Sequence, residues 1–106
     1  MRRPRIQAGQ IVWVEWDPTV GHEQQKHRPC IAISAQLGAL VIVVPLTSSR
    51  PKVGSHVEVE TRDRVSTALC EQVRSVDVQR ITKRDGAVEP DRLRAVRDVV
   101  ALLIGV

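Results

Sequence analysis

The chain has 106 residues, 42% of them hydrophobic and 26% charged, which is the balance of a folded protein with one core. Its net charge of +4 favours a polyanionic partner without identifying one. The longest apolar runs, 39–46 and 99–104, are too short to cross a membrane, and the basic start lacks the apolar segment of a secretion signal. We therefore expect a cytoplasmic protein made of one domain, residues 1–106.

The first half of the chain contains four segments with the composition of strands. GQIVWVEW, residues 9–16, is β-branched and aromatic on both faces, and we expect its two tryptophans to lie in the core or an interface. PCIAIS and ALVIVVPL are two further strands, and the AQLG between them is short enough for a hairpin. HVEVET alternates strictly, so Val57 and Val59 are expected on a buried face.

The second half begins with strand patterns and ends with a helical one. STALCEQVRSV, residues 66–76, predicts a fifth strand, and KRDGAV predicts a turn that leads into a short sixth. From Pro90 onward the apolar residues follow helical spacing, and Pro90 and Asp91 suit a first helical turn. The predicted apolar stripe consists of Leu93, Val96, Val99, Val100 and Leu103. The pattern predicts a small, mostly antiparallel β protein whose C-terminal helix covers part of a barrel.

The cysteines and histidines do not have the spacing of a metal site. Cys30 and Cys70 lie in apolar stretches without a CxxC motif, so we expect two reduced core thiols. His27 and His56 are expected to face solvent. Neither the cysteines nor the histidines have companion ligands at zinc-site spacing, and we expect no metal and no cofactor.

Three segments in order resemble the MazF/PemK (Kid-type) toxin family of bacterial toxin–antitoxin systems. They are GQIVWVEWDPTVGHEQQKHRP, VIVVPLTSS and TALCEQVRSVDVQRI, which together span residues 9–81. The resemblance implies a small SH3-like, CcdB/PemK-type β-barrel with a C-terminal helix. It also implies a homodimer that cleaves single-stranded mRNA at short sequences without a metal, and that a MazE-like antitoxin with an acidic tail inhibits.

The polar segment at residues 17–29 has two interpretations, depending on whether the resemblance is taken into account. By itself it is a surface connection, although loops of this length are uncommon in compact domains unless they are functional. The resemblance implies that it lines the RNA path. The expected RNA-binding residues are His22, Gln24, Gln25, Lys26, Ser48, Ser49, Glu71, Gln72 and Arg74.

The resemblance also implies the catalytic residues. Arg28 matches the arginine of the family's RP motif, and a guanidinium can contact two phosphate oxygens at once. Thr47 matches the second catalytic position and can donate a hydrogen bond to a phosphate oxygen. The general base stays open: Glu23 is expected, and His22 is also suited chemically, whereas arginine is a poor proton acceptor.

The chain departs from the family at two positions. Some Kid-type members depend on an arginine and an aspartate, where this chain has Leu69 and Glu71. The alternative function is that of a non-catalytic, CcdB-like toxin that binds DNA gyrase through its C-terminal helix. A third possibility is an SH3-like binding module without activity.

Overall fold

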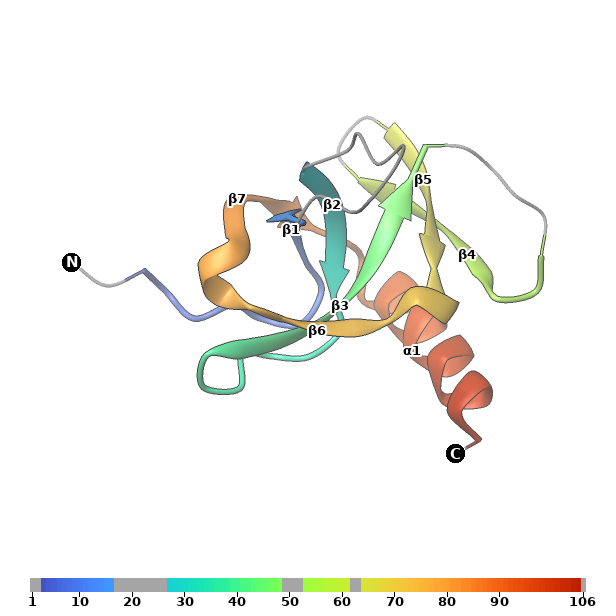
Figure 1. The fold of residues 1–106 in the computed structure, drawn as a ribbon. Helices are drawn as coiled ribbons and strands as arrows, with labels where there is room; N and C mark the ends of the chain where they lie inside the picture. Colours follow the sequence, from blue (N-terminus) through green and yellow to red (C-terminus); the bar gives the residue numbers. More distant parts are fainter. Residues whose placement is uncertain (1–2, 17–26, 49–52, 62–63, 106) are drawn as a thin grey trace, which may run out of the picture.

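The computed structural model describes residues 3–16, 27–48, 53–61 and 64–105. Within these ranges the chain forms seven strands, two short 3-10 helices and one α-helix (Figure 1). The strands are β1 Gln10–Glu15, β2 His27–Ala32, β3 Leu40–Thr47, β4 His56–Thr61, β5 Arg64–Leu69, β6 Arg74–Asp77 and β7 Ile81–Ala87. The helices are η1 Cys70–Gln72, η2 Val78–Arg80 and α1 Pro90–Ile104.

The sheet is antiparallel, and β3 is its central strand. The strand order is β4-β5-β3-β2-β1-β7, with β6 pairing the other half of β3. Residues 40–43 of β3 pair with β6, residues 43–45 with β2 and residues 46–47 with β5. The resulting half-barrel with a C-terminal helix confirms the predicted fold class.

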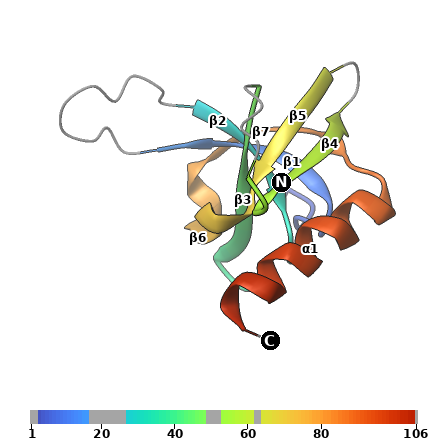
Figure 2. The ribbon, with the colours of Figure 1, turned by 90° about the vertical axis from the view of Figure 1, so that its right-hand side faces the viewer.

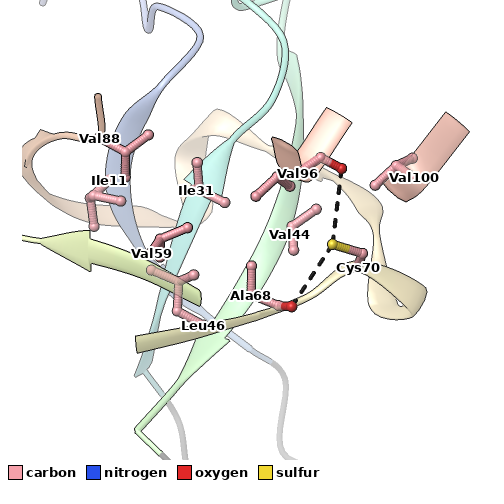
Figure 3. Packing of buried hydrophobic residues seen from close by; sticks show 10 residues of the cluster. All are labelled: Ile11, Ile31, Val44, Leu46, Val59, Ala68, Cys70, Val88, Val96 and Val100. Atoms are coloured by element: carbon pink, nitrogen blue, oxygen red, sulfur yellow. Dashed lines mark hydrogen bonds between the residues drawn. The ribbon is translucent and has the colours of Figure 1, made fainter. Parts of the chain in front are cut away.

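Two buried clusters lie on opposite faces of this strongly bent sheet. The first includes Val44 and Leu46 of β3 together with Ile31, Val59 and Val96 (Figure 3). The second includes Val41 and Val43 of β3, and it also contains Cys30 and the N-terminal Ile6. Neighbouring residues of β3 therefore supply different cores, as the alternation of side chains along a strand requires.

Helix α1 lies across the first core, as the helical spacing predicts (Figure 2). Pro90 is in its first turn, and Gly105 ends it in a left-handed conformation with φ of 81°. Val96 and Val100 are buried, but Leu103 is 49% exposed, so its predicted place on the buried stripe is wrong. No helix of the described part is long and apolar enough to span a membrane.

The hairpin between β2 and β3 is also confirmed. Leu37 and Leu40 exchange two backbone hydrogen bonds of 2.7 and 3.0 Å across Gly38 and Ala39. Gly38 has φ of 62°, a value that glycine adopts without the strain that a side chain would add.

Two predictions for the second half are wrong. The single strand predicted at residues 66–76 is interrupted by η1. The reason is that β5 pairs with the last residues of β3 whereas β6 pairs with its first residues, and η1 lies between β5 and β6. The segment KRDGAV lies mostly within β7 rather than in a turn, since its residues pair with β1. Turn-forming residues are tolerated there because the β1–β7 ladder contains two register shifts and Gly86 has φ of 78°.

A graded pair of substitutions tests the first core. Ile31 is fully buried, so Ile31→Ala should lower the free energy of unfolding by about 2–5 kcal/mol, and Ile31→Val by about 0.5–1.5 kcal/mol. Urea unfolding followed by circular dichroism measures both. Unchanged stability in the alanine variant would contradict this packing.

Candidate active site

The predicted catalytic residues lie where β2 and β3 part. Cys30 and Pro45 are the last pair of the ladder between these strands. Arg28 and Thr47 each lie two residues beyond that pair, toward the same end of the two strands and on the same face. Beyond the pair, β3 continues beside β5 while β2 stays beside β1 (Figure 1). The two residues thus occupy the two sides of the opening between these strand pairs.

Two arginines lie close to the buried thiol of Cys30. Burial raises the pKa of Cys30 to about 12, and the positive charges of Arg28 and Arg74 oppose that rise. Arg28 comes from β2 and Arg74 from β6, which pair with different parts of β3, and the register puts both residues on the face of the sheet that carries Cys30. Two positive charges near one point are suited to a phosphate group, which accepts bidentate hydrogen bonds from arginine.

Trp16 orders one of these arginines. The guanidinium carbon of Arg74 is 4.4 Å from the centre of the Trp16 ring, a cation–π distance. Trp16 also packs against the second core, as expected of a core or interface tryptophan. The contact holds Arg74 against a rigid ring and leaves the residue exposed to solvent. The sequence did not predict this pairing, because the two residues are far apart in the chain and belong to different elements.

The end of β3 adds hydroxyl groups to the site. Thr47 is half-buried and lies opposite Thr67 of β5, and Ser48 follows in an exposed position. Thr67 is 6% exposed, although it is polar. Its side chain falls on the same face as Thr47, so it is a candidate for positioning Thr47. No alternation in β5 indicates Thr67, because the last four residues of this strand are all buried.

Glu71, a predicted RNA-binding residue, is held by two neighbours. Ser55 Oγ donates to Oε1 at 2.8 Å, and His56 Nε2 is 3.2 Å from Oε2. Desolvation acts to raise the pKa of Glu71, but hydrogen bonds from its backbone, Ser55 and His56 outweigh it and lower that pKa. The carboxylate is therefore ionised at neutral pH and is poorly suited to act as a general acid.

The same contact corrects the prediction for His56. Its side chain is only 8% exposed, so it does not face solvent, whereas His27 does. The reason is that Glu71 of η1 folds over the beginning of β4 and gives the imidazole a polar partner.

The remaining site predictions divide into two groups. Gln72 is exposed on η1, next to Glu71, and stays a prediction. The other predicted residues lie outside the described ranges: His22, Glu23, Gln24, Gln25, Lys26 and Ser49. Among the described residues, no group of three or more His, Cys, Asp or Glu side chains could hold a metal ion.

Comparison with known proteins agrees with this architecture. Residues 7–104 match the family model described as PemK-like, MazF-like toxin of type II toxin–antitoxin system. The chain is 30% identical over 102 residues to the endoribonuclease toxin MazF of Escherichia coli K12, with 92% of each chain covered. The crystal structure of MazF from Deinococcus radiodurans superposes with a TM-score of 0.81 at 25% identity, covering 98% of this chain and 100% of that one.

A second solved structure contains a partner. It is MazE–MazF (Form-II) from Deinococcus radiodurans, with a TM-score of 0.78, 27% identity, and coverage of 93% of this chain and 95% of that one. The family model covers nearly the whole chain, and the identity to a curated relative extends over the same length. The chain therefore belongs to the PemK-like, MazF-like toxin family of type II toxin–antitoxin systems.

Proposed function

We propose that the protein is a toxin endoribonuclease that cleaves single-stranded mRNA at short specific sequences by attack of the substrate's own 2′-OH, without a metal. The products are a 2′,3′-cyclic phosphate and a 5′-OH. The observation that carries the proposal is the register of β2, β3 and β6, in which Arg28, Thr47 and Arg74 fall on one face of the sheet. The relatives named as endoribonucleases support the same activity and lend no support to the gyrase-binding alternative.

Arg28 has the central role in this mechanism. As the 2′-oxygen attacks, the phosphorus becomes pentacoordinate and gains negative charge on its equatorial oxygens. A guanidinium that is already in place stabilises that charge more than the charge of the ground state. Pro29 follows Arg28 and pairs with Trp13 of β1, so the backbone that carries the guanidinium is restricted. Thr47 donates a hydrogen bond to a phosphate oxygen or positions the leaving 5′-oxygen.

Arg74 and the neighbouring polar residues bind the RNA. An exposed guanidinium that is stacked on Trp16 loses little further freedom when it contacts a phosphate. The other proposed RNA contacts are His22, Gln24, Gln25, Lys26, Ser48, Ser49, Glu71 and Gln72. Because the carboxylate of Glu71 is ionised, it can accept hydrogen bonds from a base rather than contact a phosphate.

The proton transfers need a separate base. Glu23 is the proposed general base, with His22 as the alternative, since a carboxylate or a neutral imidazole can accept a proton from a hydroxyl group. The two cysteines are excluded on chemical grounds. Burial raises the pKa of Cys30 to about 12 and that of Cys70 to about 11, so both thiols stay protonated and are poor bases or nucleophiles.

The proposed partners are a second copy of the chain and an antitoxin. We propose a cytoplasmic homodimer that a MazE-like antitoxin inhibits, in keeping with the MazE–MazF complex of Deinococcus radiodurans. An acidic antitoxin segment would compete with RNA for Arg28 and Arg74. Exposed Leu102 and Ile104 at the end of α1 give the chain apolar surface for contacts with a partner chain.

Removal of the Arg28 side chain tests the active site. Arg28→Ala should lower the cleavage rate about 10²–10³-fold, because it removes one preorganised group that stabilises the transition state. Gel-based single-turnover kinetics on a long single-stranded RNA measure the rate. Arg94→Ala, on the exposed face of α1, is the matched control and should cleave at the wild-type rate. Wild-type cleavage by Arg28→Ala would place the active site elsewhere.

A pair of substitutions at Thr47 separates its hydroxyl from its shape. Thr47→Val keeps the volume but removes the donor, and it should slow cleavage by roughly ten- to a hundredfold. Thr47→Ser keeps the donor and should retain most of the rate. Equal rates in both variants would mean that the hydroxyl has no part in the chemistry.

A substrate with one 2′-deoxy nucleotide just 5′ of the scissile bond tests the chemistry. It should resist cleavage, because the nucleophile is absent, yet bind nearly as well, because affinity comes mainly from phosphate contacts and stacking. It should therefore act as a competitive inhibitor, and EDTA should leave cleavage of the normal RNA unchanged. Cutting of the deoxy strand at the same bond, or inhibition by EDTA, would contradict the proposed mechanism.

A further inference from the structure

A second basic site lies on the other side of β1 from the candidate active site. A hollow of about 360 Å³ opens where the N-terminal segment passes β7, and Arg3, Pro4, Thr82, Lys83 and Arg84 line it. Its volume is within the roughly 300–1,000 Å³ range of small-molecule sites. A smaller hollow of about 120 Å³ shares Arg3, Pro4 and Arg84 with it. The two hollows meet at Arg84 and share no residue with the site at Arg28.

Arg84 is the unusual member of this site. Its Nε is inaccessible to solvent and has no hydrogen-bond partner among the described residues. The smaller hollow is lined by Arg84 together with the apolar Ile6, Val78 and Ile81 and the amide of Gln36. A buried N–H of a charged group that lacks a partner is costly, so such groups are ordinarily paired.

The cations at the hollows are not matched by acids in the lining. Both hollows are lined without an acidic side chain among the described residues, while Arg3 and Lys83 add two more cations. Asp85 is adjacent in sequence, but its Oδ2 accepts a hydrogen bond of 3.4 Å from Trp13 Nε1. Lys83 lies 5.8 Å from the centre of the same tryptophan ring, and Thr82 Oγ1 donates to Trp13 O at 3.4 Å. Trp13 thus contacts three residues of β7, of which Thr82 and Lys83 line the larger hollow.

We propose that this hollow, lined by Arg3, Thr82, Lys83 and Arg84, binds a phosphate group. A phosphate offers several acceptor oxygens and the negative charge that three cations require, and the guanidinium of Arg84 is suited to contact two of those oxygens. The proposal does not depend on endoribonuclease activity, because the binding residues differ from those of the candidate active site.

The phosphate has two possible sources, a free phosphate monoester or the backbone of a bound RNA. Val12 of β1 pairs with Cys30 on one side and with Arg84 on the other. Two strand spacings, roughly 10 Å, therefore separate the backbones of β2 and β7 at this point. An RNA held at Arg28 could extend its neighbouring phosphates to the hollow.

Titration of the 106-residue protein with inorganic phosphate tests the site. Isothermal titration calorimetry, at constant ionic strength set with chloride, should show saturable binding by the wild-type protein. Arg84→Gln and Arg3→Gln should each weaken binding about tenfold or more, because each removes a charge-assisted hydrogen bond. Arg3 is exposed outside the core, so its variant is expected to fold normally even if Arg84→Gln does not. Arg94→Gln, on the exposed face of α1, is the control and should bind as the wild type does.

Absence of saturable binding, unchanged binding by both Arg3→Gln and Arg84→Gln, or equal loss in the Arg94→Gln control would overturn the proposal. A second arm identifies the source by measuring the affinity for a 2′-deoxy-blocked oligonucleotide without a terminal phosphate. If Arg3→Gln weakens this affinity, the hollow holds a backbone phosphate; if only binding of inorganic phosphate and adenosine 5′-monophosphate is weakened, the ligand is a free monoester. Neither arm measures cleavage, so a failure of the proposed endoribonuclease activity would be seen separately.

Discussion

The whole structure depends on the burial of both faces of β3. This strand pairs with β6, β2 and β5 in turn, and its alternating side chains enter two different cores. A shift of one residue would move Val43 and Val44 into each other's cores and would also displace every strand paired with β3. The register is therefore fixed, and the positions of Thr47 and Arg74 are fixed with it. The candidate active site lies at the end of β3, beyond the last residues that pair with β2.

The charges in the described residues show a consistent arrangement. Acidic side chains near the basic sites have local partners: Glu71 is held by Ser55 and His56, and Asp85 accepts from Trp13. Two of the cations at these sites, Arg74 and Lys83, lie instead over tryptophan rings. Positive charge that is not neutralised by the protein itself is what attracts a polyanion such as RNA, or an acidic segment of another protein.

Much of the fold could be predicted from the sequence because the signals are local. Alternation in HVEVET, the β-branched run before Pro45 and the helical spacing after Pro90 each arise within one segment, and the structure confirms all three. The errors come from distant contacts. Whether KRDGAV forms a turn or a strand depends on the β1 edge beside it, and the break at η1 depends on the two halves of β3.

For the site, the sequence by itself was enough to indicate Arg28 and Thr47, because both residues lie in family motifs that occur in the expected order along the chain. It also determined the basic charge and the absence of zinc-site spacing. Only the tertiary structure decided that Arg74 stacks on Trp16, that Glu71 is bound by His56, and that the Nε of Arg84 is buried without a partner among the described residues. Each of these arrangements involves residues on separate elements, and strand order and register, rather than any local pattern, bring such residues together.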